Sequence, residues 1–240
     1  EIGTMLNILF YSFTILIWGS TWLGIKYQLG VVAPAWSIAY RFALAALLLM
    51  IWCLVTKRPM RFSVKDHLYI ALQGIMLFSL NYFLFYLSEL YITSGLAAVV
   101  FSTIVIMNLI NGRIFLGTPM EWRVLLGAGA GLVGLGLLFW PELASVNFSG
   151  PILFGMFLSF GATYLASLGN ILSARNQQQV LPVVQPNAYG MSYGALCMLL
   201  IAVLSGDPMQ LEMTPAYLIS LGYLALFGSV IAFGCYLSLI

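Results

Sequence analysis

The chain has 240 residues, of which 62% are hydrophobic and 7% are charged, and its formal net charge is +2. A soluble globular chain carries about 25% Asp, Glu, Lys and Arg, so this composition cannot cover a surface that faces water. It predicts a protein whose solvent is the lipid bilayer. The small net charge, without a basic run interleaved with aromatic residues, argues against a nucleic-acid partner.

Cutting the apolar stretches at proline, glycine and clustered charges predicts eight spanning segments. In chain order they cover residues 5–25, 34–56, 68–88, 93–116, 122–140, 150–174, 183–204 and 216–240. Lipid offers the backbone no hydrogen-bond partners, and the segments lack the short alternation of barrel strands, so we expect helices. No Lys or Arg precedes the first segment and no small-residue cleavage site follows it, so we expect it to be retained rather than removed as a signal peptide. The predicted fold class is all-α, a polytopic membrane helix bundle.

Lys and Arg in short loops predict the orientation of the chain. Seven of the nine cationic residues fall in or beside loops on one side of the predicted bilayer: Lys57, Arg58, Arg61, Lys65, Arg113, Arg123 and Arg175. The opposite loops hold Glu89, Glu142, Asp207 and Glu212, with Lys26 as their one cation. We therefore expect the N-terminus in the cytoplasm.

Two short matches indicate an internal repeat of about 150 residues. The segments 58–70 and 207–219 align at Pro59 and Pro208, and the segments 83–90 and 233–240 share a Tyr-Leu-Ser triplet at an offset of 150. A unit of five spans is odd in number, so the second copy must cross the membrane inverted. The charges agree, because 58–70 is basic whereas 207–219 carries Asp207 and Glu212 without a cation.

Inverted repeats are the architecture of many secondary transporters. The repeat divides the chain into residues 1–145, with helices 1–5, and residues 146–240, an incomplete second copy with helices 6–8. On this alignment residue 240 corresponds to residue 90. We therefore expect ten helices in the natural protein, eight of them in this chain, with a continuation of about 50 to 60 residues.

Four strings resemble the first half of an EamA-type member of the drug/metabolite transporter superfamily. They are WGSTW (18–22), AYRFALAALLL (39–49), SGLAAVVFST (94–103) and LGAGAGLVGLGLLF (126–139), and their order and spacing are more specific than any one of them. The resemblance implies ten helices in two inverted repeats, a central cavity, and movement of small metabolites or drugs, often as export. Two departures are the missing proline in the fourth span and Thr118, where the family commonly has an acid.

Arg41 lies within the second predicted span, about 10 Å below the outer boundary at a rise of 1.5 Å per residue. One interpretation is a structural arginine bound by carbonyl groups and outer headgroups. The other is that Arg41 faces the bundle interior and pairs with Glu89, at the outer end of the third span, as a charge pair or a coupling site. The resemblance adds that an arginine in the second helix recurs in the family.

Polar and aromatic side chains at helical spacing predict a substrate path. The sixth span places Ser159, Thr163, Ser167 and Asn170 on one face. The full set of candidate substrate-binding residues is Trp18, Ser20, Trp22, Asn81, Tyr82, Tyr86, Ser159, Thr163, Tyr164, Ser167 and Asn170. Packing between helices through Ser, Thr and Asn is the alternative interpretation of the polar residues.

Other functions find less support in the sequence. Intramembrane hydrolysis needs a nucleophile with its base or a pair of aspartates, and metal chemistry needs a cluster of ligands, so we expect no enzyme activity, metal or cofactor. A channel is the alternative to a carrier, because pores also use polar faces. The glycines of the fifth span favour internal packing over a homodimer, which stays open. The sequence thus predicts an integral protein of the bacterial inner membrane that exports small organic solutes, such as amino acids or drug-like compounds.

Overall fold

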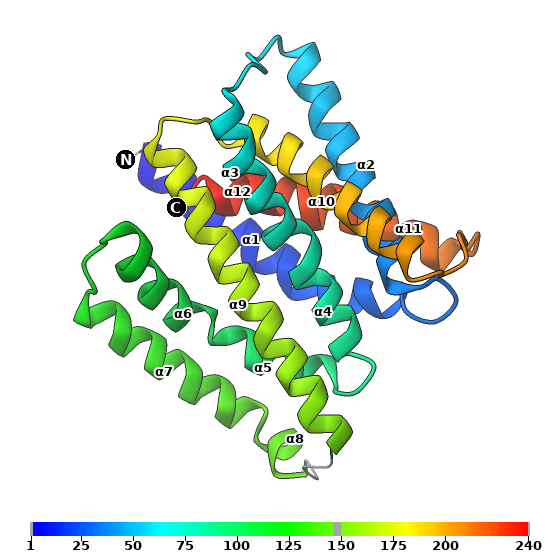
Figure 1. Ribbon diagram of the computed structural model, residues 1–240. Helices are drawn as coiled ribbons and strands as arrows, with labels where there is room; N and C mark the ends of the chain where they lie inside the picture. The colour runs from blue at the N-terminus through cyan, green and yellow to red at the C-terminus, as the bar shows by residue number, and fades with distance from the viewer. Residues whose placement is uncertain (1, 146–149, 240) are drawn as a thin grey trace.

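The computed structural model describes residues 2–145 and 150–239, in which helices joined by loops are present and no strand occurs. Figure 1 shows long helices packed into one bundle, with α7 and α6 along one edge. The predicted all-α membrane bundle is confirmed. The predicted boundary between residues 145 and 146 meets the segment 146–149, which lies outside the described residues, as does the predicted end of the last span at residue 240.

The described helices form eight segments, which we call the first to eighth spans. They are α1 (Ile2–Lys26); α2 (Pro34–Val55); α3 (Val64–Ile75) with η1 (Met76–Leu80) and α4 (Asn81–Ser88); α5 (Ser94–Ser102) with α6 (Ile104–Asn111) and η2 (Gly112–Leu116); α7 (Trp122–Leu138); α9 (Gly150–Gln178); α10 (Val184–Leu204); and α11 (Pro215–Tyr223) with η3 (Leu224–Ile231) and α12 (Ala232–Leu237). A short helix, α8 (Trp140–Ser145), follows α7. Seven of these spans are long and apolar enough to cross a membrane, and α7 is the shorter eighth.

The largest boundary errors occur where polar residues continue a helix. The third span begins at Val64 rather than 68, because Ser63 caps it: its hydroxyl accepts a hydrogen bond from the Asp66 amide (3.1 Å) and donates one to the Asp66 carboxylate (2.6 Å). The sixth span runs to Gln178 rather than 174. Hydropathy marks the apolar part of a helix, and these helices extend past it.

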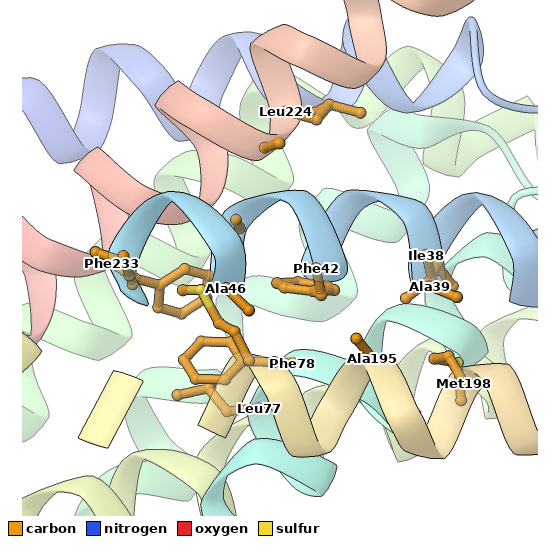
Figure 2. Packing of buried hydrophobic residues seen from close by; sticks show 14 of the residues in the cluster. Ile38, Ala39, Phe42, Ala46, Leu77, Phe78, Ala195, Met198, Leu224 and Phe233 are labelled. Carbon is orange, nitrogen blue, oxygen red and sulfur yellow. The ribbon is translucent and has the colours of Figure 1, made fainter. Parts of the chain in front are cut away.

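Much of the core lies between α2 and α10, which pack against each other. Figure 2 shows Phe42 of α2 facing Phe78 of η1, with ring centroids 5.7 Å apart, and Phe78 also packs on Phe233 of α12 at 4.9 Å. The third span approaches α10 very closely, since a Cβ on Gly74 would overlap the backbone of Gly190. Small residues thus set the closest helix contact of the core.

The contacts between spans follow a reciprocal pattern. The third span packs on the sixth and seventh, and the eighth span packs on the first and second. Both the third and the eighth span contain a π-helical segment, η1 and η3 respectively.

The glycine-rich α7 lies at the periphery, where it contacts the fourth span and α8. None of its described residues is buried, and a Cβ added at Gly127, Gly131 or Gly134 would meet no atom within 4 Å. The close internal packing that the sequence favoured for these glycines is therefore not formed by the described residues.

Candidate functional site

A cavity of about 230 Å³ lies between the helices of the bundle. It is lined from the first, third, fourth, sixth and eighth spans. The lining residues are Trp18, Thr21, Trp22, Ile25, Leu77, Asn81, Tyr82, Phe85, Phe101, Ile104, Val105, Asn108, Ala166, Asn170, Phe233 and Tyr236.

Aromatic rings form a large part of the cavity wall, with seven of the sixteen lining residues. Trp22, Phe85 and Phe101 meet edge to face with ring centroids 5.4–6.2 Å apart, which joins the first, third and fourth spans. Trp18 packs on Phe233 at 5.0 Å and on Tyr236 at 4.9 Å, which joins the first and eighth spans. Such a wall offers apolar surface with rigid geometry to an apolar or aromatic group.

Asparagine side chains supply the amide groups of the lining. The Oδ1 atoms of Asn81 and Asn170 are buried and accept no hydrogen bond in the structure, although Asn170 Nδ2 donates to Asn108 Oδ1 at 3.5 Å. A buried acceptor without a partner costs free energy, so most such atoms in proteins are satisfied by protein, water or ligand. The structure thus leaves two buried carbonyl oxygens, on residues that line the cavity, without a hydrogen-bond partner.

Five of the predicted substrate-binding residues line this cavity together: Trp18, Trp22, Asn81, Tyr82 and Asn170. Ser20 lies elsewhere, in a second hollow on the outside of the first and eighth spans, where its hydroxyl is 2.6 Å from that of Tyr223. Tyr164 is 43% exposed on the outer surface of α9. The side chain of Tyr86 is fully buried outside the lining, and its hydroxyl has no hydrogen-bond partner.

The polar face of the sixth span is divided between two environments. Ser159, Thr163 and Ser167 are buried but do not line the cavity. The Thr163 hydroxyl donates to the Ser159 carbonyl (2.8 Å), and Ser167 Oγ accepts from Asn111 of the fourth span (2.9 Å). Asn170, one turn further, is the member of this face that reaches the cavity.

The sequence interpretation missed the contribution of the fourth span. Phe101, Ile104, Val105 and Asn108 follow a spacing of i, i+3, i+4 and i+7, which places them on one helix face. A polar Asn108 on an otherwise apolar stripe was the available signal. Phe233 and Tyr236 were also missed, although Tyr236 lies 150 residues after Tyr86 in the internal repeat.

Arg41 faces the bundle interior and is 1% exposed. Its Nε donates to Ser229 Oγ at 3.0 Å, and its guanidinium carbon lies 4.5 Å from the ring centroid of Tyr82 and 5.1 Å from that of Phe42. Its Nη1 is buried without a hydrogen-bond partner in the structure. The charge is therefore held by a hydroxyl group and two aromatic rings.

Glu89 lies one residue beyond the end of the third span. Its Oε2 accepts from the Ser94 hydroxyl at 2.9 Å, and its Oε1 is buried without a partner. Burial raises the pKa of the Glu89 carboxyl to about 7, against smaller lowering effects of the Ser94 hydrogen bond and the Lys26 charge. Arg41 and Glu89 form no ion pair in the described structure, because each is bound to other residues.

Within the described residues, no three His, Cys, Asp or Glu side chains are grouped so as to hold a metal ion. The three cysteines are free thiols.

A helical bundle with seven membrane-length helices and a central cavity is the structure of an integral, multi-pass membrane protein. The chain belongs to the EamA-like transporter family, which matches residues 5–140. The resemblance to EamA-type drug/metabolite transporters is thereby confirmed, and the chain is a membrane transporter.

Similar proteins carry transporter names. An uncharacterized inner membrane transporter of Escherichia coli K12, YedA, is 27% identical over 232 residues, which cover 94% of this chain and 71% of YedA. The uncharacterized transporter YyaM of Bacillus subtilis is 24% identical over 90% of this chain and 71% of its own length. The fold also matches that of a protein with a solved crystal structure. The two superpose with a TM-score of 0.77 at 15% sequence identity, over 98% of this chain and 78% of the other. At that identity the likeness concerns the fold alone.

Proposed function

We propose that this protein is a secondary transporter that exports small organic metabolites, such as amino acids or drug-like compounds, by alternating access to the central cavity. The observation that carries the proposal is the cavity itself, which lies between spans of both predicted halves and combines aromatic walls with unpartnered amide oxygens. Such a cavity suits a small solute with an apolar body and a few hydrogen-bonding groups.

Alternating access requires two halves that can exchange conformations, and the division into residues 1–145 and 146–240 supplies them. The reciprocal packing of the third and eighth spans supports an inverted repeat, since each lies against the first two spans of the other half. The π-helical segments support it too, because η1 begins at Met76 and η3 at Leu224, close to the offset of 150. In many transporters, swapping the conformations of such halves opens a midplane site to alternate sides.

The location we propose is the bacterial inner membrane, with the N-terminus in the cytoplasm. Seven cationic residues on one side support this orientation, and relatives of the chain include a protein named as an inner membrane transporter.

The test is solute flux with the purified protein in proteoliposomes. Saturable uptake of a labelled amino acid that is accelerated by unlabelled solute inside the vesicles would identify a carrier. Unitary currents without counterflow would instead identify a channel and overturn the proposal. A comparison of efflux between cells that overproduce the protein and cells that lack it gives the direction, and lower external solute in the overproducing cells would contradict export.

A further inference from the structure

Arg41 is a buried cation without an acidic partner. In the described structure its Nε donates to the Ser229 hydroxyl, the hydroxyl groups of Tyr82 and Tyr86 also interact with the guanidinium, and its Nη1 has no hydrogen-bond partner. Across the described spans the one acidic side chain is Asp66, in the first turn of α3. A charge buried in this way is unfavourable unless an opposite charge approaches it, so its retention requires an explanation.

The fold does not require a cation at this position. At the offset of 150, Met191 occupies the position in α10 that corresponds to Arg41 in α2, and Ser79 corresponds to Ser229. Met191 is fully buried, and the Ser79 hydroxyl has no hydrogen-bond partner. The second half therefore packs the matching place with a neutral side chain.

Arg41 lies directly behind the wall of the cavity. The guanidinium stacks over Tyr82, whose ring lines the cavity. Its Nη2 would lie 3.2 Å from a Cβ built on Gly228, and the carbonyl of Gly228 accepts a hydrogen bond from Trp18 Nε1 at 3.2 Å. Trp18 and Tyr82 thus form the layer between the charge and the cavity.

A charge one side-chain layer away acts on the content of a cavity with apolar walls. At about 8 Å and an effective dielectric constant of about 20, Coulomb's law favours a carboxylate over a neutral group by about 30-fold. The Asn81 and Asn170 oxygens are hydrogen-bond acceptors and cannot neutralise the cation.

We propose that Arg41 is the charge-selecting residue of the cavity, and that the transported solute carries a carboxylate on the side of Tyr82. This inference rests on the proposed function, since it names the chemistry of the solute that the same cavity holds. It assigns Arg41 a role in selectivity, acting through the Tyr82 layer, rather than in helix packing.

The test uses two probes that share an indole ring and differ in charge, indole-3-acetate and tryptamine. Apparent binding constants come from the thermal stabilisation of the purified protein in detergent at increasing probe concentration. We expect the wild type to bind indole-3-acetate at least about tenfold more tightly than tryptamine. Arg41→Met, which copies the neutral residue of the second half, should reduce this ratio about tenfold or more, whereas Arg41→Lys should retain most of it.

The matched control is Arg175→Met. Arg175 also stacks on a tyrosine, with its guanidinium carbon 3.6 Å from the ring centroid of Tyr69, but it does not line the cavity. The ratio should be unchanged in this variant. An unchanged ratio in Arg41→Met, or an equal loss in Arg41→Met and Arg41→Lys, would assign Arg41 to structure and overturn the proposal.

The wild type decides the question even if Arg41→Met does not fold. Equal binding of the two indoles, a preference for tryptamine, or no binding of indole-3-acetate would each contradict a charge-selecting arginine. None of these results affects the transport proposal, because counterflow of a neutral or cationic solute would still identify a carrier.

Discussion

At the scale of single residues, the site contains a buried amide group that has no hydrogen-bond partner in the protein. Asn81 and Asn111 are both buried, at 4% and 3% exposure, yet they differ in their partners. Asn111 donates to Ser167, whereas the carbonyl oxygen of Asn81 points to no partner. The sequence predicted Asn81 from its neighbours on the third span, but it could not tell a satisfied amide from an unsatisfied one, because that difference depends on which helix lies opposite.

This contrast predicts opposite effects of the same substitution. Asn81→Leu removes an unpartnered acceptor, so the midpoint of thermal unfolding should stay the same or rise, while the initial rate of counterflow should fall about tenfold, the effect of losing about 1.4 kcal/mol of binding. Asn111→Leu breaks a buried hydrogen bond, so it should lower the unfolding midpoint by several degrees and leave the affinity for solute in the folded fraction unchanged. A counterflow rate in Asn81→Leu equal to that of the wild type would remove Asn81 from the site.

Glu89 predicts a stability that depends on pH. Because burial raises the pKa of its carboxyl to about 7, from an ordinary value of 4.5, the folded state favours the protonated form. The wild type should therefore lose stability as pH rises from about 4.5 through about 7, and little further change should follow above that range. The Glu89→Gln variant is neutral throughout, so its unfolding midpoint should match that of the wild type near pH 4 and exceed it by a few degrees near pH 8. Glu121→Gln, at an exposed position just before α7, is the control, and a constant difference between Glu89→Gln and the wild type across the pH range would refute the assignment.

At the scale of elements, helix length could be predicted from the sequence and helix partners could not. Apolar length limited by Pro34, Gly117 and the charged loops located all eight spans, because the bilayer requires about 20 residues in each. The polar face of α9 was visible as a pattern, but Thr163 bonds within α9, Ser167 bonds to the fourth span and Asn170 lines the cavity. This division depends on which helices lie against α9. The sequence periodicity of α9 gives no information about its neighbours. The same limit explains why glycines in α3 and α7 look alike in sequence and differ in contact.

The two kinds of glycine give a prediction about helix contacts. A Cβ on Gly74 would overlap the Gly190 backbone, so Gly74→Ala should lower the free energy of unfolding by about 1–3 kcal/mol through separation of the third span from α10. Gly131→Ala meets no atom within 4 Å, and alanine is the better helix former, so it should be neutral or stabilising by up to about 1 kcal/mol. Reversible unfolding in detergent measures both variants. Equal effects of the two substitutions would show that the third span does not approach α10 as closely as described.

At the scale of the whole molecule, the central question is whether the two halves cross the membrane in opposite directions. The π-helical segments, the reciprocal span contacts and the unequal loop charges are independent of one another, and an inverted repeat accounts for all three. It also explains why the cavity is lined from the first and sixth spans together, because these open the two halves. The matches at an offset of about 150 and the loop charges led to this plan in the sequence, and it stays a prediction. The position of the cavity could not be predicted from the sequence, because it depends on how spans about 150 residues apart pack together.

The proposed inverted repeat predicts that Lys57 and Asp207, which it places in matching loops of the two halves, face opposite sides of the bilayer. Replacing Cys53, Cys197 and Cys235 by alanine gives a background for single Lys57→Cys and Asp207→Cys variants. In intact cells a membrane-impermeant thiol reagent should label the variant at 207, and labelling at 57 should appear only after the membrane is opened. An Arg61→Cys variant controls for local accessibility, since it shares the loop of Lys57 and should follow its pattern. Labelling of 57 and 207 from the same side would rule out inversion, and the alternating-access mechanism would then need a different structural basis.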